Sequence, residues 1–504
     1  MGRFALGGDK SFESRAIRLL FCSLFFVAVA LSLFGSLLPN SVADFSVQRA
    51  FLCLLIVLFV TVGFGAYLSV PNISSRSLWS LSLLVCIVVL VLAQAFFSGN
   101  HFKWVEPGLY IGFLASVILF GGLLGRNLSV LSVLEPVSVI LGLSIVLYGF
   151  LSLNYYWFSL SDPEVKISDY LPWGFVNIRY WSHVATWLLP LVPLILGNRL
   201  ASRSKLWKVA VMLGGAIWVW MVVLSSARGT SVSLVAGTGL AVLLFGRASL
   251  PWLKQFGAVL LCGGILWMLL SVVIPALLGF SFEGRELKMG SSGRWILWQE
   301  SFVMSLQNFP FGMGPQAWLY HEPLVDGYKT SKAFGHPHNM YLMWAAEYGW
   351  LVVFLMFGLF FSAVFRLVGA RRRLKVMTVP HSELILCGFM VSTVSALVHA
   401  SISSVFLAPA SMLIGLFVLI IFYAMLQRPE DRSFKLSSPV LRVKPIPAAL
   451  CLTGLLAVSL WWLGEVYHYH QAMVRDLPVY LEQPSNAYFP RFWYHGYFPR
   501  SDSL

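Results

Sequence analysis

The chain has 504 residues, of which 58% are hydrophobic and only 11% charged, and its mean hydropathy is +0.79. A soluble protein of this length and composition would expose too much apolar surface, so the sequence indicates a polytopic membrane protein. The formal net charge of +14 points first to membrane orientation rather than to nucleic acid, because Lys and Arg concentrate in cytoplasmic loops.

Apolar runs of helix length recur along the chain and predict thirteen transmembrane helices. Pro and Gly inside these runs are compatible with a bundle, because neighbouring helices can satisfy the backbone groups that they leave unpaired. The predicted spans are 17–38, 49–69, 78–97, 107–124, 132–153, 182–197, 206–225, 230–246, 256–279, 340–365, 383–405, 409–427 and 445–463.

The Lys and Arg distribution predicts the orientation of these spans. With a cytoplasmic N-terminus and alternating spans, most of the 35 basic residues fall in cytoplasmic segments and most of the 21 acidic residues fall outside. The first apolar run is too long for a cleaved signal peptide, and no small-x-small cleavage site follows it. We therefore expect the intervals 280–338 and 464–504 to lie outside the cytoplasm.

A long polar interval, 280–338, divides the spans into two groups. Within it, apolar residues from Trp295 to Leu306 predict an amphipathic helix, and a loop of this length with a helix of its own is more typical of function than of disorder. Tyr and Trp in the tail are typical of interfacial anchoring. The expected parts are 1–279 with helices one to nine, 280–338 as a catalytic loop, 339–463 with helices ten to thirteen, and 464–504 as an aromatic-rich tail.

Two arginines lie at expected helix starts on the outer side. Arg228 occupies the tight turn Ser226–Gly229 between two spans, and Arg294 follows the Gly- and Ser-rich segment 290–293. A helix start offers unpaired N–H groups and a positive dipole end, and a guanidinium pairs bidentately with phosphate oxygens. The pair predicts a diphosphate site, with turn arginines that extend to the interface as the alternative.

His338 lies at the expected start of span ten, where Pro337 fixes its approach. The helix dipole disfavours its cationic form, so a neutral side chain able to accept a proton is expected. A capping histidine is one alternative, and His336 as the base is another. Asn339 adds an amide, and Glu347, about 13 Å deeper, is expected either to orient a partner or to pair with an arginine.

The other polar features are expected to be structural. His183 and His399 lie within spans, where interhelical hydrogen bonding is the expected role. His468 and His470 form an H-x-H without further ligands, so no metal site is predicted. Walker loops, G-x-G-x-x-G turns and Cys-x-x-Cys pairs do not occur. The cysteines all fall in spans and predict no disulfide framework; they are Cys22, Cys53, Cys86, Cys262, Cys387 and Cys451.

In this order, the motifs resemble the O-antigen ligase family, whose members include Wzy-type polysaccharide polymerases and protein O-oligosaccharyltransferases. The resemblance covers roughly residues 170 to 350. The segments that carry it are 174–179 leading into Leu189-Pro190-Leu191, 226–229, 292–298 with 310–314, and 336–339 with Glu347 and Gly349.

The resemblance implies an all-α, GT-C-like bundle of 12–13 transmembrane helices in the bacterial inner membrane, with one large periplasmic loop containing short helices. It implies glycan transfer from an undecaprenyl-diphosphate-linked donor to an acceptor sugar hydroxyl at the periplasmic face. O-antigen ligation to lipid A-core, a step of lipopolysaccharide biosynthesis, is the preferred activity, and Wzy-type polymerisation of O-antigen or exopolysaccharide is the alternative.

In the implied glycosyltransferase mechanism, His338 is the base, Arg228 and Arg294 hold the diphosphate, and Arg179 is a third cation. No metal or other cofactor is expected. A flippase or secondary transporter is a remoter alternative, since a flippase should carry cations along a transmembrane path and a transporter should show repeated halves with broken helices.

Overall fold

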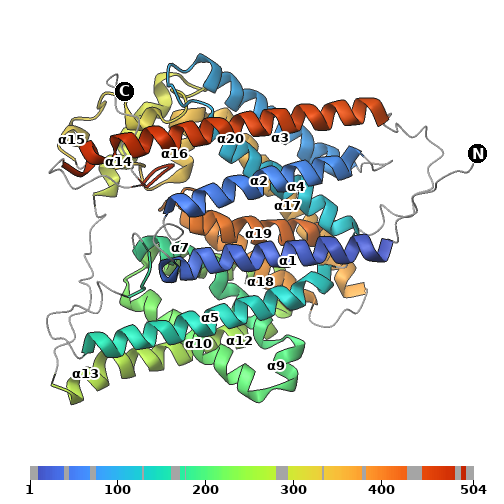
Figure 1. The fold of residues 1–504 in the computed structure, drawn as a ribbon. Helices are drawn as coiled ribbons and strands as arrows, with labels where there is room; N and C mark the ends of the chain where they lie inside the picture. Colours follow the sequence, from blue (N-terminus) through green and yellow to red (C-terminus); the bar gives the residue numbers. More distant parts are fainter. Residues whose placement is uncertain are drawn as a thin grey trace, which may run out of the picture.

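The structure is a computed structural model, and it describes residues 10–38, 45–68, 75–127, 130–160, 171–175, 178–279, 293–331, 334–376, 382–427, 445–482 and 490–494. These residues form helices and connections, with no strand among them (Figure 1). Long apolar runs become helices because a helix pairs nearly all of its backbone polar groups internally, which lipid surroundings require.

The N-terminal helices are α1 (Lys10–Phe34), η1 (Gly35–Leu37), α2 (Phe45–Leu68), α3 (Ser75–Phe97), α4 (Val105–Asn127) and α5 (Val130–Leu160). The middle of the chain forms α7 (Ile178–Leu188), η2 (Leu189–Leu191), α8 (Val192–Leu196), α9 (Arg199–Arg203), α10 (Lys205–Leu224), α11 (Arg228–Phe245), η3 (Gly246–Ser249), α12 (Leu250–Met268), η4 (Leu269–Val273) and α13 (Ile274–Leu277). The remaining helices are α14 (Arg294–Gln307), η5 (Ala317–Leu319), α15 (Asp326–Lys329), α16 (Met340–Tyr348), α17 (Trp350–Val376), α18 (Ser382–Ala400), α19 (Pro409–Leu426) and α20 (Pro445–Glu482).

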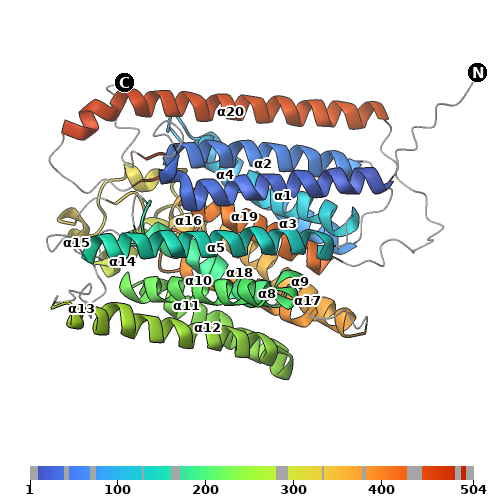
Figure 2. The same ribbon diagram turned by 60° about the horizontal axis from the view of Figure 1, so that its bottom comes forward.

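The long helices lie roughly side by side, so the bundle has two ends (Figures 1 and 2). We call the end that carries α14, α15 and α16 the loop end, and the end at which α1 begins the basal end. Helix termini at the basal end are rich in basic residues, namely Arg15, Arg18, Arg126, Arg199, Arg203, Lys205, Lys208, Arg247, Lys254, Arg366, Arg371 and Arg372.

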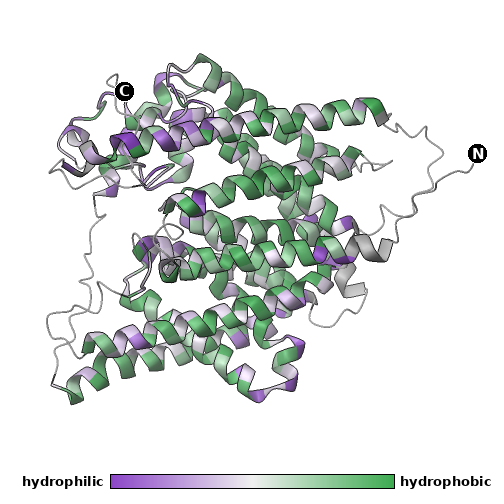
Figure 3. Cartoon of the chain, viewed as in Figure 1, coloured by the Kyte–Doolittle hydropathy of each residue, from purple (hydrophilic) through white to green (hydrophobic). Residues whose placement is uncertain are grey.

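Among the residues that the structure describes, eleven segments are long and apolar enough to cross a membrane, which confirms a polytopic helical membrane protein. Hydrophobic residues dominate the long helices, and hydrophilic residues gather toward the ends (Figure 3). One segment, 228–277, has 50 residues and contains both α11 and α12. A single helix of that length would span about 75 Å, so these two helices correspond to two crossings, as the predicted spans 230–246 and 256–279 require.

Helices α19 and α18 form the centre of the bundle. In the most apolar 18-residue stretch of each helix, 89% of α19 and 78% of α18 is buried. Helices α1, α2, α4, α7 and α17 pack around α19. Helix α20 lies at the periphery, along α2 and α4, and only 6% of its most apolar stretch is buried. It continues to Glu482, beyond the end expected at residue 463, so the last helix reaches well into the loop end.

Predicted span 182–197 is not one continuous membrane-spanning helix. It is divided into α7, η2 and α8, with a turn of 3₁₀-helix at Leu189–Leu191. The break follows from Pro190, which has no N–H to donate and crowds the preceding turn. Trp252 Nε1 donates to the Pro190 carbonyl over 2.9 Å, so a neighbouring helix satisfies the broken backbone.

Predicted span 340–365 is also interrupted. Gly349 has φ +91°, which ends α16 at Tyr348 and separates it from the spanning helix α17. The extended segment after Gly312 packs against this break: the Met313 and Gly314 N–H groups donate to carbonyls at the end of α16 over 2.8 and 2.9 Å. Helix α16 therefore belongs to the loop end rather than to a membrane span.

The six cysteines are all free and lie in the helices expected from the sequence. Four are buried or half-buried, in α1, α2, α12 and α18, and the two on α3 and α20 are exposed. No disulfide links cysteines among the described residues, in agreement with the sequence.

Candidate active site

Three arginines lie in the first turns of three helices at the loop end. Arg179 is the second residue of α7, Arg228 the first of α11, and Arg294 the first of α14, so the helix starts predicted for Arg228 and Arg294 are confirmed. The N-cap residues of α11 and α14, Ala227 and Gly293, accept no hydrogen bond through a side chain. The positive dipole ends of these helices therefore lie beside the guanidinium groups.

Arg294 is half-buried. Burial, together with the nearby charges of Arg179 and Arg228, lowers the pKa of Arg294 to about 10. The three guanidinium groups thus share one electrostatic environment, and Arg294 remains protonated at neutral pH. Its buried Nε has no hydrogen-bond partner among the described residues. Such an arrangement is stabilised by an anion.

His338 lies in a tight turn beside this group and two residues before α16, rather than at a helix start. Asn339 is the N-cap, and its side chain accepts from the Tyr341 and Leu342 N–H groups, each over 3.1 Å. The backbone of His338 has φ +56°, which is uncommon for a residue with a side chain and is often found at functional sites. This geometry corrects the position expected from the sequence and shows Asn339 as the residue that fixes the start of α16.

The expectation that His338 is neutral agrees with the structure, although for a different reason. Burial lowers the pKa of His338 well below its usual range, and the charges of Arg179 and Arg294 act in the same direction. Nδ1 of His338 is buried and has no hydrogen-bond partner among the described residues. The side chain is therefore a neutral imidazole next to cations, which is a suitable state for accepting a proton.

His336 supports the His338 turn. Its Nδ1 accepts from the His338 backbone N–H over 3.1 Å, and the ring centroids are 4.3 Å apart. Burial lowers the pKa of His336 well below its usual range, with His338 and Arg491 acting in the same direction. Because its Nδ1 is already used as an acceptor, His336 is less suited than His338 to the role of base.

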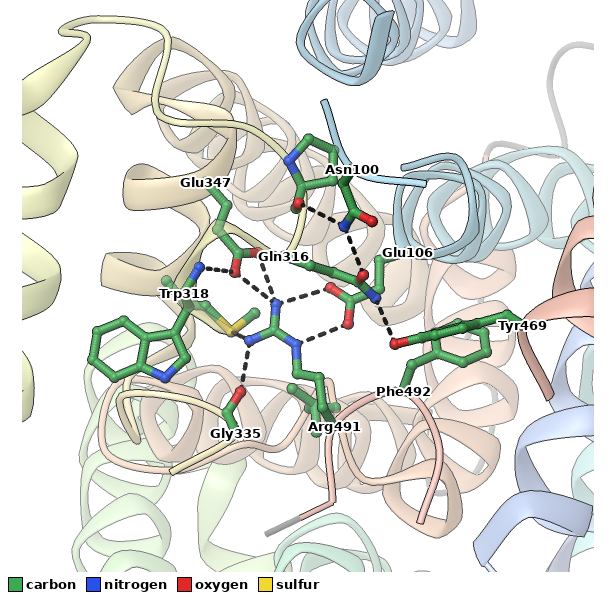
Figure 4. Close-up of polar contacts among 12 residues, drawn as sticks. Asn100, Glu106, Gln316, Trp318, Gly335, Glu347, Tyr469, Arg491 and Phe492 are labelled. Carbon is green, nitrogen blue, oxygen red and sulfur yellow. Dashed lines mark hydrogen bonds and ion pairs between the residues drawn. The ribbon is translucent and has the colours of Figure 1, made fainter. Parts of the chain in front are cut away.

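Glu347 pairs with an arginine, one of the two roles expected for it, and the arginine is Arg491 from the tail (Figure 4). Arg491 Nη2 lies 2.7 and 2.9 Å from the Glu347 carboxylate oxygens, and its Nε and Nη2 each lie 2.8 Å from an oxygen of Glu106. Nη1 of Arg491 donates to the Gly335 carbonyl over 2.9 Å. The Trp318 N–H also donates to Glu347, over 3.3 Å.

The sequence did not predict Arg491 or Glu106 as residues of the site. Arg491 is fully buried in a tail expected to anchor at the interface, and Glu106 lies at the start of α4, where an acidic residue commonly stabilises a helix end. They lie 385 residues apart, so no local spacing relates them. A buried arginine in an aromatic segment carries no recognisable signal until the fold places it.

Of the two deeper histidines, His399 makes the predicted interhelical hydrogen bond, whereas His183 bonds the connection between α18 and α19. His183 Nε2 lies 2.8 Å from Ser403 Oγ, and His399 Nδ1 lies 2.9 Å from Thr186 Oγ1. Gly229 has no room for a side chain, because a Cβ there would lie 2.5 Å from His399 Nε2. These contacts hold the start of α11 against α7 and α18, and so position Arg228.

Glu283, Glu286 and Glu300 are the acidic residues of the interval 280–338 that could serve as metal ligands beside the arginines. Among the residues that the structure describes, no group of three potential ligands occurs. Glu300 is fully buried, and its carboxylate accepts from His321 Nε2 and from the Leu324 and Val325 N–H groups, all over 2.8 Å. Its oxygens are therefore committed to folding the loop. The other two candidates, Glu283 and Glu286, lie outside the described residues.

An apolar cavity of about 450 Å³ extends from beneath α16 toward the basal end. Tyr341 and Trp344 of α16 line it near the loop end, and Arg366 of α17 lines it near the basal end. Its other walls come from α4, α11, α18 and α19, and are largely apolar. The cavity thus lies beneath the helix that follows the histidine turn.

Residues 213–357 match the family model described as O-antigen ligase. Over this segment, the chain is similar to the O-antigen ligase family. The match to this family includes Arg228, Arg294, His336, His338 and Glu347. It does not extend to Arg179, Glu106 or Arg491. A comparison with curated proteins finds no match.

This similarity supports glycan transfer of the ligase or polymerase type in general, with a lipid-linked glycan and an acceptor as substrates. It also implies a bacterial membrane protein. The family alone does not choose between ligation and polymerisation.

Proposed function

We propose that this protein is an O-antigen ligase that transfers a glycan from an undecaprenyl-diphosphate-linked donor to a sugar hydroxyl of lipid A-core at the periplasmic face of the inner membrane. The observation that carries the proposal is the buried, neutral His338 beside Arg294 and Arg179. A proton acceptor next to several cations suits a reaction in which a hydroxyl is deprotonated while a diphosphate leaves.

In this mechanism, the acceptor oxygen attacks the anomeric carbon of the donor, and the bond from that carbon to the diphosphate oxygen breaks. His338 takes the hydroxyl proton, so the acceptor oxygen becomes the new glycosidic oxygen. Negative charge grows on the departing diphosphate, where Arg294 and Arg228, with Arg179 as a third cation, stabilise it. Charges fixed before the reaction are effective because they need not reorganise in the transition state.

The lipid-linked nature of the donor is supported by the apolar cavity beneath α16. Its aromatic rim at Tyr341 and Trp344 lies on the helix that follows the His338 turn, and its walls suit a hydrocarbon chain. A lipid chain in this cavity would leave a diphosphate near the loop end. The first helical turns that carry Arg179, Arg228 and Arg294 lie at that same end of the bundle.

The orientation of the site is supported by the basic basal end. Lys and Arg concentrate on the cytoplasmic side of membrane proteins, so the basal end is assigned to the cytoplasm and the loop end to the periplasm. The chain then meets its donor after the lipid-linked glycan has crossed the membrane. A flippase or transporter is disfavoured by this grouping of arginines at one end.

The test is a glycan profile of a strain that lacks this gene, complemented with wild-type protein or with His338→Ala. We expect the deletion to leave bare lipid A-core and polymer on its lipid carrier. Wild type should restore ligation, whereas His338→Ala should reach the membrane and restore none, because it removes the proton acceptor. His101→Ala, at an exposed loop position, is the matched control and should restore ligation fully.

Other outcomes identify other functions. Core capped with a single repeat unit in the deletion strain would replace the ligase proposal with a polymerase. Full complementation by His338→Ala would remove His338 as the base and transfer attention to His336. An unchanged glycan profile in the deletion strain would contradict both activities.

A further inference from the structure

The tail segment 490–493 inserts into the loop end of the bundle and is held there by charged groups. Arg49 of α2 is fully buried, and its Nε donates to the Phe492 carbonyl over 3.0 Å. The same guanidinium lies 5.0 Å from the centre of the Phe492 ring, a cation–π arrangement. Arg491, Phe492 and Trp493 are all buried, so this segment is packed as core rather than lying on the surface.

Arg491 contacts the chain on both sides of the histidine turn. Before the turn, Nη1 donates to the carbonyl of Gly335, the residue next to His336. After the turn, Nη2 bonds the Glu347 carboxylate near the end of α16, and Nη1 lies 2.9 Å from Met343 Sδ. Glu106 fixes the guanidinium from the side of α4 (Figure 4).

The turn needs such external support. A residue with a side chain in the left-handed region costs free energy and persists only where its surroundings hold it, and His338 has φ +56°. Within the turn, the His338 N–H donates to His336 Nδ1, and His336 is itself part of the strained segment. Asn339 fixes the start of α16, and Arg491 fixes the other side at Gly335.

We propose that Arg491 is a positioning residue of the candidate active site, through which the C-terminal tail holds the His336–His338 turn in place. This inference rests on the proposed function for its kinetic consequence, but not for its structural one. Arg491 acts through Gly335 and Glu347 and does not itself contact a substrate. The tail thus becomes a component of the site, outside the segment that matches the family model.

The test uses Arg491→Lys in the full-length chain. Lysine keeps the charge between Glu106 and Glu347, but a single ammonium cannot bond both carboxylates and the Gly335 carbonyl in the planar geometry of a guanidinium. We expect the kcat for glycan transfer to fall at least about tenfold, with the donor KM changed by less than about twofold, because only alignment of the base is lost.

A second measurement does not depend on activity. Diethyl pyrocarbonate modifies neutral imidazoles, and site-resolved mass spectrometry gives its rate at each histidine. In Arg491→Lys we expect His338 to be modified at least about fivefold faster, since the loosened turn exposes a buried ring. Exposed His101 should be unchanged, and Arg475→Lys, on the exposed side of α20, should match wild type in both assays.

Each outcome has a distinct meaning. Wild-type kcat together with wild-type protection of His338 would overturn the positioning role. Suppose that wild-type protein transfers no glycan, but Arg491→Lys still makes the modification of His338 faster. This result would contradict the proposed function and leave the positioning role standing. Reduced folded protein with wild-type protection of His338 in the remaining folded fraction would show that Arg491 acts on stability alone.

If Arg491→Lys yields too little folded protein, the double variant Arg491→Gln/Glu106→Gln replaces it. In wild type, Arg491, Glu106 and Glu347 together carry a formal charge of −1. In the double variant only Glu347 is charged, so the sum is still −1. It removes the guanidinium bond to Gly335 without leaving an additional buried charge. Faster modification of His338 supports the proposal, and unchanged modification contradicts it.

Discussion

Arg294 is the residue of the candidate site at which side-chain geometry matters most. It is half-buried, whereas Arg228, at the start of α11, is exposed. A buried cation has fewer waters to replace a lost hydrogen bond, so the shape of its donor group determines what it can bind. The two arginines are therefore expected to respond differently to the same substitution.

We predict that Arg294→Lys reduces kcat/KM for glycan transfer at least about tenfold although the charge is kept, because lysine cannot reproduce a bidentate fork. Arg228→Lys, at the exposed position, should cost less. Steady-state transfer with purified protein measures both, with Arg475→Lys as the control. Equal and small effects at positions 294 and 228 would show that charge alone is sufficient.

The pH dependence of transfer follows from the low pKa of His338. An ordinary histidine, with a pKa of 6.5, would lose about tenfold of its neutral form between pH 7.5 and 5.5, whereas a lowered pKa keeps the base neutral as the pH falls. We predict that protonation of His338 lowers kcat/KM by less than about twofold between pH 7.5 and pH 5.5.

Glu347 provides the control for this profile. Burial raises its pKa to about 7, against the attraction of Arg491 and with the repulsion of Glu106, so its protonation falls within the same pH range. The profile should therefore be recorded in wild type and in Glu347→Gln. An acid limb with a pKa near 6.5 that persists in Glu347→Gln would contradict the assignment of His338 as a neutral base.

The residues that bind the leaving group also make a prediction about metals. If arginines hold the diphosphate, transfer by purified protein should continue in excess EDTA at an undiminished rate. Glu283→Gln and Glu286→Gln should be mild. Loss of activity in EDTA, with recovery on addition of Mg²⁺ or Mn²⁺, would replace the arginine mechanism with a metal-assisted one.

Local patterns in the sequence were sufficient to predict some site residues and not others. Arg228 and Arg294 could be recognised because each lies at the start of an apolar helix. His338 could be recognised by the proline before it and the helix after it. Arg491 contacts Glu347 across 144 residues, and the two occupy segments of unrelated character. Contacts of this kind depend on tertiary packing, which no periodicity encodes.

Among the helices, the break at Gly349 has the clearest energetic origin. A Cβ at this position would lie 2.2 Å from the Pro310 carbonyl oxygen and 2.5 Å from the Phe311 carbonyl carbon. Both contacts are with backbone, which cannot move aside easily. The φ of +91° adds strain for any residue with a side chain.

We predict that Gly349→Ala lowers the stability of the folded protein by about 1–3 kcal/mol or more, from backbone strain and the clash together. Thermal unfolding in detergent measures the change, and transfer activity should fall with it because α16 carries Glu347. Gly464→Ala is the control, since a Cβ there meets nothing within 4 Å in the middle of α20. A tolerated Gly349→Ala would mean that α16 and α17 can join.

The two interrupted spans show the limit of hydropathy at the scale of the element. An average over apolar residues detects the membrane interior and does not register a positive φ or a missing N–H. The predicted spans 182–197 and 340–365 are apolar throughout, yet Pro190 and Gly349 divide them. Both breaks lie on segments that carry site residues, where irregular backbone is most useful.

For the whole molecule, the orientation of the bundle is the central expectation. We predict that a reporter fused after Leu504 is periplasmic and that one fused near Arg372 is cytoplasmic, because basic residues concentrate at the basal end. Alkaline phosphatase and green fluorescent protein fusions measure the two locations. A cytoplasmic reporter at Leu504 would require α20 not to cross the membrane.

The position of Arg491 also sets when the ion cluster can form during synthesis. Glu347 leaves the ribosome 144 residues before Arg491, an interval of roughly 7–30 s at bacterial and eukaryotic elongation rates. Throughout that interval α16 holds a buried carboxylate without its cation, while α17 to α20 are still being made and inserted. A chain interrupted between residues 427 and 490 has α19 and every helix that packs around it, and lacks the ion cluster beside the histidine turn. The nascent protein therefore passes through a stage in which its membrane bundle is assembled and its loop end is still open.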